Sequence, residues 1–392
     1  MVLRTERGLY QIYLLGDVSE HLRNRLTQTL SELVDVFGFK IGGEVTVGNA
    51  ASVSNMDTKA ACAALYVAGS AFSEDDTNAI QDLLRHNVPI IPYLSTQQAW
   101  EDVLPTSLKS LNGMRQRQGD DRLEELSSAI LECVGLLRRQ RRVFISYRRT
   151  ESRDAAVQIH AQLLVRGFDV FLDTHSVRVG DPFQDVLWHR LVDSDVVVML
   201  DTKGFSESCW TRRELGTASY CGVSILRIKW PQSSQNRSYE QYETIPLAAD
   251  SLTNRGSLKS AILPKIALAV ESIRSRAIAA RYRAICGQIE IEVQKIGAVV
   301  KGIGANRAIA IELPNTGAIY VYPVVGVPTA EVINEIASNV DRAREEARSI
   351  IAFDHLGVRQ SWLSHLEWLN QRLSAPKTHK ARELGLYLVQ QD

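Results

Sequence analysis

The sequence predicts an α/β protein built mainly from parallel sheets, and three observations lead to this prediction. Short apolar runs alternate with longer stretches whose apolar residues recur at helical spacing, the pattern of parallel βα units. One run, Asp195–Leu200, is almost continuously apolar, which is typical of a strand covered on both faces. The chain has 392 residues, too many for one ordinary hydrophobic core. We therefore expect two or three α/β domains.

The first expected domain covers residues 1–138. Its strands are predicted at Tyr10–Leu15, Phe39–Glu44, Ala64–Ala68 and Val88–Leu94. Its clearest helices are predicted at Leu22–Phe37 and Leu123–Leu137. The basic run Arg138–Arg142 follows, and we interpret it as a linker.

The second expected domain, residues 141–277, repeats this order of elements. Its strands are predicted at Val143–Tyr147, Asp169–Asp173, Asp195–Leu200 and Val223–Ile228, with helices at Ala155–Arg166 and Leu258–Ala277. A turn-rich loop, Thr174–Gly180, precedes Asp181-Pro182, which is a favourable helix start. The aspartate can cap the helix, and the missing N–H of proline costs nothing at the first helical position.

Short matches between these two parts indicate a duplication. Phe72-Ser-Glu74 matches Phe205-Ser-Glu207, and Gly38-Phe39 matches Gly167-Phe168 at a similar separation. In a tandem repeat with small loop insertions, the number of residues between matching positions changes only slightly along the chain. Any two α/β domains can also share short coincidences, but we favour duplication.

The remaining segment, residues 278–392, predicts a small α/β or α+β module. Its expected strands are Ala308–Leu313, Ala318–Pro323 and Ser349–Phe353, and its expected helices are Thr329–Arg348 and Trp362–Leu373. No motif in it identifies a family. Trp362, His365 and Trp368 lie near one helix face and could bind a trigger molecule, but core or interface packing is the simpler interpretation.

Composition narrows the classes of partner and compartment. Lys plus Arg and Asp plus Glu each total 45, so the formal net charge is zero, which argues against binding to nucleic acid or a membrane surface. No apolar run approaches the ~20 residues of a membrane helix, and no secretory signal is expected. The five cysteines are scattered without a Cys-x-x-Cys pair. We expect a cytoplasmic protein without a bound metal or cofactor.

Two clusters near strand ends are candidates for a binding site. The run Tyr147-Arg148-Arg149 follows the strand that starts at Val143, and ligands gather outside the carboxyl ends of parallel strands. Two guanidinium groups there could hold a diphosphate, but solvated loop charges are the favoured interpretation of these two residues alone. Trp210 and Glu214 are four residues apart on one predicted helix face, which suits a nucleoside-sized ligand. From spacing alone, a core tryptophan and an exposed carboxylate remain the favoured interpretation.

Three motifs favour a binding site over purely structural roles for these residues, because together the motifs resemble the Toll/interleukin-1 receptor (TIR) domain family. These are Val143-Phe-Ile-Ser-Tyr-Arg-Arg149, Arg166-Gly-Phe-Asp-Val-Phe-Leu-Asp173 and Ser208-Cys-Trp-Thr-Arg-Arg-Glu-Leu215, in that order. The resemblance covers residues 141–277, about a third of the chain, and implies a flavodoxin-like sheet of five parallel strands. It also implies that Thr174–Gly180 is the BB loop, which closes over the site and joins neighbouring subunits.

Within that family, the chain is most similar to the NAD-cleaving branch of bacterial TIR proteins. The resemblance implies that Glu214 is catalytic and that the nicotinamide–ribose bond of NAD is broken, with NAD as substrate. Arg148, Trp210, Tyr147 and Arg149 would then contact the substrate. Whether the product is ADP-ribose or cyclic ADP-ribose stays open. The resemblance further implies activation by self-association in a defence or cell-death response, and the alternative is a non-catalytic TIR scaffold that recruits other proteins.

The first domain lacks the same residues. By the Phe72-Ser-Glu74 match, Thr77 stands in the place of Trp210 and Gln81 in the place of Glu214. We therefore expect residues 1–138 to form a degenerate TIR-like domain without catalysis, which serves in packing, assembly or sensing.

Overall fold

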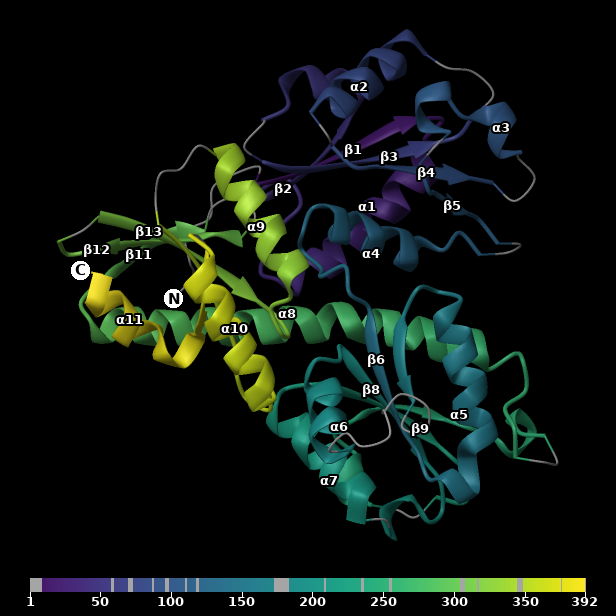
Figure 1. Cartoon of the computed structure of the whole chain (residues 1–392). Coiled ribbons are helices and arrows are strands. Elements are labelled where there is room, and N and C mark those ends of the chain that lie inside the picture. Colours follow the sequence, from purple (N-terminus) through teal and green to yellow (C-terminus); the bar gives the residue numbers. More distant parts are fainter. Residues whose placement is uncertain are drawn as a thin grey trace.

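A 33-residue helix, α8 (Leu263–Lys295), runs through the middle of the molecule and packs against all three of its sheets (Figure 1). The computed structural model describes residues 9–391, except for 58–59, 70–72, 87, 96–98, 110, 118–119, 173–182, 208, 234–235, 254–255, 304–306, 316, 344–347 and 375. Within these residues each of the three sheets has five strands, and two of the sheets are all-parallel. The α/β class predicted from the sequence is confirmed.

The first sheet has the strand order β2-β1-β3-β4-β5. Its strands are β1 (Tyr10–Gly16), β2 (Val45–Asn49), β3 (Ala61–Val67), β4 (Ile90–Leu94) and β5 (Met114–Arg115). Its helices are α1 (Glu20–Asp35), α2 (Glu74–Arg85), α3 (Trp100–Val103) and α4 (Leu123–Cys133). The strand predicted at Phe39–Glu44 is displaced, because a turn containing Gly42 at φ +84° delays the start of β2 to Val45.

The second sheet has the order β10-β9-β8-β6-β7, which is the same topology as the first sheet. Its strands are β6 (Arg142–Ser146), β7 (Asp169–Leu172), β8 (Val196–Asp201), β9 (Ser224–Lys229) and β10 (Glu243–Pro246). Its helices are α5 (Arg149–Leu164), α6 (Phe183–Val192) and α7 (Cys209–Tyr220). Both sheets thus have the flavodoxin-like order, as a duplication would produce. The short strand β10 was not predicted.

Helices cover both faces of the second sheet. Alternate strand residues such as Val143 and Ile145 pack under α5 and the first half of α8. Phe144 lies on the opposite face, with Leu187 of α6 and Leu215 of α7. This alternation explains why its central strands are apolar on both sides.

The third sheet is mixed. Its strands are β11 (Val299–Ile303), β12 (Ile309–Leu313), β13 (Gly317–Val324), β14 (Arg348–Phe353) and β15 (Lys377–Lys380). The pairs from β11 to β13 are antiparallel and those from β13 to β15 are parallel. Helices α9 (Ala330–Ala343) and α10 (Gln360–Arg372) pack on one face, and α8 and α11 (Leu384–Gln391) on the other.

Helix α8 is longer than the sequence predicted. The expected helix ended at Ala277, where the limit of the second domain was placed, but α8 continues without a break to Lys295. Ile266 and Val270 in its first half belong to the core of the second sheet. Tyr282 and Ile289 in its second half lie in a core that the first and third sheets share. The domain limits stay predictions, and the 277/278 limit falls inside this helix.

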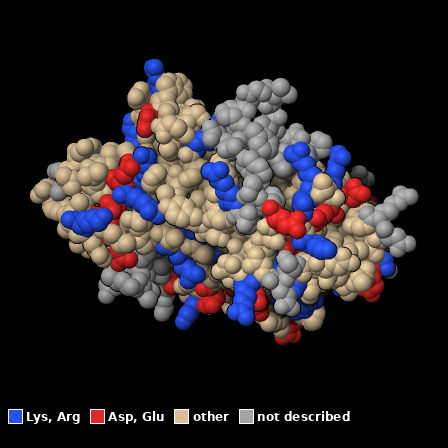
Figure 2. Space-filling view, turned by 90° about the horizontal axis from the view of Figure 1, so that it is seen from below, with Lys and Arg blue, Asp and Glu red and all other residues tan. Residues whose placement is uncertain are grey.

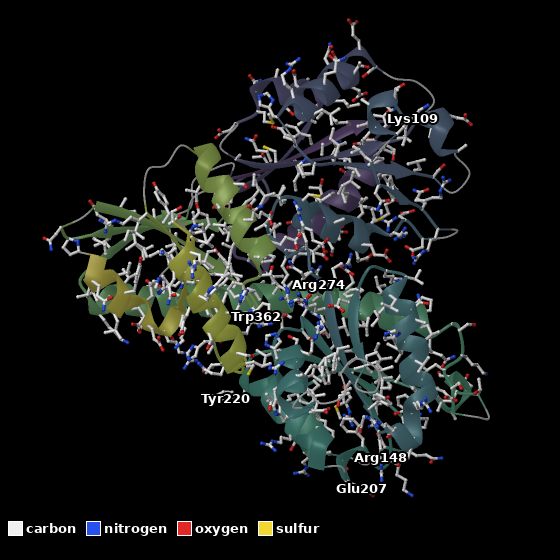
Figure 3. The ribbon with its side chains drawn as sticks, viewed as in Figure 1. Lys109, Arg148, Glu207, Tyr220, Arg274 and Trp362 are labelled. Carbon is white, nitrogen blue, oxygen red and sulfur yellow. The ribbon has the colours of Figure 1, made fainter. Side chains whose placement is uncertain are left out.

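The basic run Arg138–Arg142 leads from α4 into β6, and part of it is buried in ion pairs. The Arg138 guanidinium pairs with Asp195, at 2.6 Å from Nε to Oδ1, and with Asp193. Arg274 of α8, which is fully buried, reaches the other oxygen of Asp195 at 3.0 Å. Figure 3 shows Arg274 at the centre of the molecule, where the three sheets meet. The run therefore connects two domains as predicted for a linker, but the burial and pairing of Arg138 were not predicted, because its partners come together only in the folded protein.

Candidate active site

The carboxyl ends of β6 and β8 define the candidate site. In the second sheet the chain leaves β6 toward β7 on one side, whereas β8 lies on the other, so these two strands flank the topological switch point. Ligands of doubly wound sheets bind at such a point, outside the carboxyl ends of the strands. Ser146 is the last residue of β6 and pairs in register with Met199 of β8.

Glu214 lies next to this point, on α7. Its side chain is buried, with 6% of the residue exposed, and Ser146 is 1% exposed. The Ser146 hydroxyl donates a hydrogen bond to Oε2 of Glu214 at 2.6 Å. A buried carboxylate requires such donors, because removal from water disfavours its charge unless hydrogen bonds replace the lost solvation. The structure thus places Glu214 at the carboxyl edge of the sheet, and its predicted role in catalysis stays a prediction.

Arg148 begins the turn between β6 and α5, and other acidic residues hold its guanidinium. Its Nη1 donates to Oε1 of Glu151 at 2.9 Å and to Oε2 of Glu207 at 3.0 Å. Glu151 also accepts a hydrogen bond from the amide of Gly204 at 3.0 Å. Figure 3 shows Arg148 and Glu207 together at one edge of the molecule. A substrate diphosphate would have to replace these two carboxylates as the partner of Arg148.

Electrostatics around Arg148 favour a charged Glu151. Burial acts to raise the pKa of Glu151, but the hydrogen bonds that it accepts and the Arg148 charge outweigh burial and hold its pKa below the usual value. A side chain at Gly204 would displace this pair, since a Cβ there would lie 1.4 Å from Nη1 of Arg148. Glu151 and Glu207 were not predicted from the sequence. The spacing of Arg148 and Glu151, three residues apart at a helix start, was the available signal.

Tyr147 points away from Glu214. It is 5% exposed and packs in the core on the α5 side of the sheet, with Val143 and Ile145. Ser146 faces the other side of the sheet, toward α7. Arg149 is an exposed first residue of α5. The structure thus places Tyr147 on a different side of the sheet from the carboxylate, whereas the role of Arg149 stays a prediction.

Two predicted features lie outside what the structure describes. The backbone places Trp210 one helical turn before Glu214 on α7, but its side chain is not among those described. The loop Thr174–Gly180 falls in the undescribed range 173–182. The roles given to both stay predictions.

The equivalent edge of the first sheet has no buried glutamate at the position that matches Glu214. Gln81 and Thr77 are exposed on α2, whereas Glu214 is buried. Asp76 accepts a hydrogen bond from the amide of Gly16 at 2.9 Å, which ties α2 to the end of β1. These contacts agree with the expectation that residues 1–138 lack catalysis, which stays a prediction.

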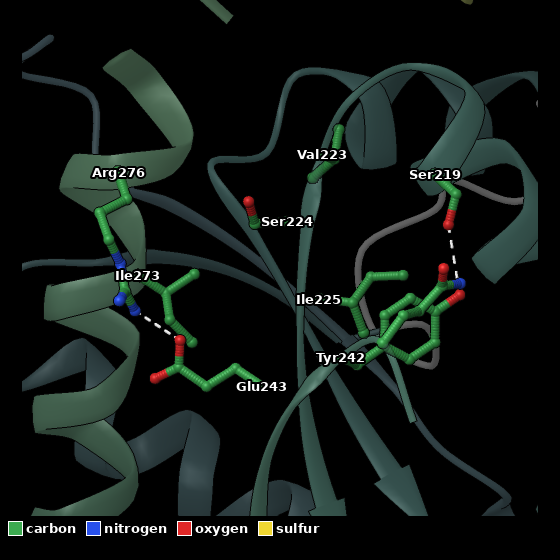
Figure 4. Close-up of a pocket in the computed structure, with 9 residues that line it drawn as sticks. Ser219, Val223, Ser224, Ile225, Tyr242, Glu243, Ile273 and Arg276 are labelled. Carbon is green, nitrogen blue, oxygen red and sulfur yellow. Dashed lines mark hydrogen bonds and ion pairs between the residues drawn. The ribbon is translucent and has the colours of Figure 1, made fainter. Parts of the chain in front are cut away.

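A cavity of about 390 Å³ lies elsewhere on the second sheet, among α7, α8, β9 and β10 (Figure 4). Ser224 and Glu243, the first residues of their strands, line it together with Arg276, so it opens at the amino edge. Glu243 and Arg276 form an ion pair on one side, and Ser219 and Tyr242 share a hydrogen bond on the other. Because Ser146 ends its strand, this cavity and the candidate site occupy opposite ends of the sheet.

Comparison with known families decides what the second sheet is. Residues 143–249 match the family model described as the TIR domain. This segment is a TIR domain. The match covers four of the five strands entirely and most of the first, from Val143 of β6 to Pro246 of β10, and includes α7 with Glu214.

Solved structures add little. The chain is similar to proximal thread matrix protein 1 from the mussel byssus, at 11% identity and a TM-score of 0.21, over 71% of this chain and 98% of that chain. It is also similar to tagatose-6-phosphate ketose/aldose isomerase from Escherichia coli, at 10% identity and a TM-score of 0.20, over 69% of this chain and 82% of that chain. These similarities are too low to support an argument about function.

Membrane and metal binding were also tested on the described part of the chain. None of its helices is long and apolar enough to cross a membrane. Its His, Cys, Asp and Glu side chains form no group that could hold a metal ion. On the face shown in Figure 2, Lys and Arg side chains alternate with Asp and Glu. Such mixing, like the zero net charge, gives a polyanion no continuous surface of one sign there.

Proposed function

We propose that the TIR domain of this chain cleaves the nicotinamide–ribose bond of NAD, with Glu214 as the catalytic carboxylate. One observation carries the proposal: a buried carboxylate lies at the switch point of a TIR sheet, held there by the Ser146 hydroxyl. The resemblance to NAD-cleaving TIR proteins, with a glutamate four residues after a tryptophan, supports the choice of substrate.

The reaction follows from where charge develops. The C–N bond breaks with its electron pair going to nicotinamide, which leaves as a neutral molecule, and positive charge develops on the ribose. An anionic carboxylate beside the sugar stabilises that charge, as in glycoside hydrolysis. Water then attacks the anomeric carbon and loses a proton, giving ADP-ribose. Attack by the adenine ring instead gives the cyclic product.

The remaining predicted residues belong to the same proposal. Arg148 would leave Glu151 or Glu207 to hold the diphosphate, and Trp210 would line the nucleoside pocket. Self-association of TIR domains would switch the enzyme on, as part of a cytoplasmic defence response.

The test is nicotinamide release by the purified full-length chain, measured by chromatography at rising protein concentration. Glu214→Gln should lower the rate by at least about 100-fold, the usual scale for a lost electrostatic contact in the transition state. Glutamine has nearly the same volume and its carbonyl oxygen can still accept from Ser146, so the fold should survive. Glu240→Gln, at an exposed position of the same domain, is the matched control and should be unaffected.

A non-catalytic scaffold is the second candidate. The observation that favours it is the pairing of Arg148 with Glu151 and Glu207, which satisfies its charge without a ligand. If assembly is confirmed by light scattering and wild type still releases no nicotinamide, the scaffold is correct. If Glu214→Gln retains full activity, another residue is catalytic.

A further inference from the structure

The Ser146–Glu214 hydrogen bond joins two side chains of unequal freedom. Ser146 belongs to a central strand, and its backbone is fixed by the parallel ladder between β6 and β8. Its side chain is short and 1% exposed, so it cannot follow a moving substrate. Glu214 has a longer side chain that projects from a helix toward the sheet. The hydroxyl is therefore the fixed member of the pair.

The direction of the hydrogen bond is determined by chemistry. A serine hydroxyl has one proton, and an ionised carboxylate can only accept. The hydroxyl of Ser146 therefore donates its proton to the hydrogen bond with Oε2 of Glu214. The distance of 2.6 Å between the two oxygens is typical of an O–H···O⁻ bond. A donor on one carboxylate oxygen fixes the rotation of the whole group and hence the direction in which its other oxygen points.

We infer that Ser146 is a positioning residue, which holds the Glu214 carboxylate in the orientation that faces the developing charge on the sugar. This inference rests on the proposed NAD cleavage. Ser146 acts through Glu214 and does not itself contact substrate. Stabilisation of a transition state by a fixed charge depends on such preorganisation, because a carboxylate that must first rotate loses part of its effect.

The inference predicts a specific kinetic pattern for Ser146→Ala. We expect kcat to fall by about 10- to 100-fold, the range for losing one charge-assisted hydrogen bond. KM for NAD should change less than about threefold, because an interaction used only in the transition state changes kcat and leaves KM nearly unchanged. Ser146→Thr keeps a hydroxyl in a strand position that suits β-branched residues, and should recover part of the lost kcat.

A matched control separates this role from a general loss of packing. Ser194 lies in the same domain, is 2% exposed, and donates its hydroxyl to the carbonyl oxygen of Arg190 at 2.7 Å. Ser194→Ala removes a similar buried hydroxyl with no contact to Glu214, and kcat should stay at the wild-type value. Thermal melting of each variant checks that it is folded.

A double-mutant cycle tests the pathway through Glu214. Glu214→Asp shortens the side chain by one methylene and draws the carboxylate away from Ser146. In that background Ser146→Ala should have little further effect on kcat, although it has a large effect in wild type.

The outcomes distinguish the inference from the function on which it rests. If wild type is active and folded Ser146→Ala keeps its kcat, or raises KM alone, the inference is wrong and NAD cleavage stands. The same holds if Ser194→Ala lowers kcat as strongly, or if the two effects in the cycle simply add. If wild type is silent while assembled, the proposed function fails and the inference fails with it.

Discussion

Glu214 and Asp195 are two buried carboxylates of one domain that lie in different local environments. Asp195 is fully buried between Arg138 and Arg274, and although burial acts to raise its pKa, these two cations hold the pKa below its usual value. It is fixed in an ionic network. Among the contacts given above, Glu214 has instead a neutral hydroxyl as partner, at the edge where ligands bind. The first arrangement fixes a charge inside an ionic network, and the second places a carboxylate where the proposed reaction needs one.

His379 of β15 is a residue whose environment predicts a pH effect on stability. Its ring stacks on Tyr387 at 3.7 Å between centroids, and burial, together with Lys377, lowers its pKa from 6.5 to about 4. Between these values the unfolded chain binds a proton that the folded chain does not. The free energy of unfolding should therefore decrease as the pH falls from about 6.5 to about 4.

His379→Phe removes this titration and keeps a ring against Tyr387. Urea unfolding at pH 7 and pH 5 should show that wild type loses more stability than the variant does. Other groups titrate in both proteins, so the difference between the two losses reports His379. Equal losses would contradict the prediction.

At the scale of elements, the loop after β14 is seated on the helices that flank the candidate site. Leu356 packs against the core formed by α6, α7 and the sheet, and the Trp362 ring of α10 lies 5.7 Å from His189 of α6. Figure 1 shows α10 reaching toward α6. The loop after β14 and helix α10 thus contact the TIR domain on the face covered by α6 and α7.

Gly357 lies in that contact. It has φ +73°, and a Cβ there would lie 2.5 Å from Cγ2 of Val192. Gly357→Ala should destabilise the protein by about 2 kcal/mol more than Gly297→Ala, because both strain a left-handed backbone but only the first creates a clash. Gly297 has φ +71° with nothing within 4 Å of the Cβ position. Urea unfolding measures both changes, and equal values would mean that the loop yields without cost.

At the scale of the whole molecule, α8 and its ion pairs connect the three sheets. Arg274 pairs with Asp195 of the TIR domain and with Glu132 of α4, and its Nη2 donates to the carbonyl oxygen of Arg138. Asp193 accepts a hydrogen bond from the amide of Val327 at 3.1 Å, which extends the same network to the third sheet. The first and third sheets also share one apolar core along α8. We therefore expect the three parts to unfold together.

Arg274→Met tests the network. Removing one member of a buried ionic cluster leaves the charges of its partners buried without an opposite charge. We therefore expect the free energy of unfolding to fall by about 3–5 kcal/mol. Arg276→Met is the matched control on the same helix. Its guanidinium is half exposed and pairs with Glu243 at the surface. Arg276→Met should therefore lower the free energy of unfolding by at most about 1 kcal/mol. Chemical denaturation compares the two variants. A similar small loss in both would show that the network contributes little.

Most helices and strands of the first two sheets, and the TIR domain, could be predicted from the amino-acid sequence alone. In strands such as β8 and helices such as α1, the spacing of apolar residues along the chain predicts which residues are buried. The motif around Trp210 and Glu214 indicated which helix carries the candidate carboxylate. Short strands such as β5 and β10 were not predicted, because they contain too few apolar residues to form a pattern.

The contacts between distant side chains became visible only in the folded protein. Neither the Ser146–Glu214 hydrogen bond nor the buried pairing of Arg138 with Asp195 could be read from spacing, because each joins residues more than fifty positions apart. The continuation of α8 past Ala277 was hidden for a related reason: its two halves turn apolar faces to different cores. Periodicity records that a residue is buried, whereas the partner of a buried charge is fixed by how the elements pack.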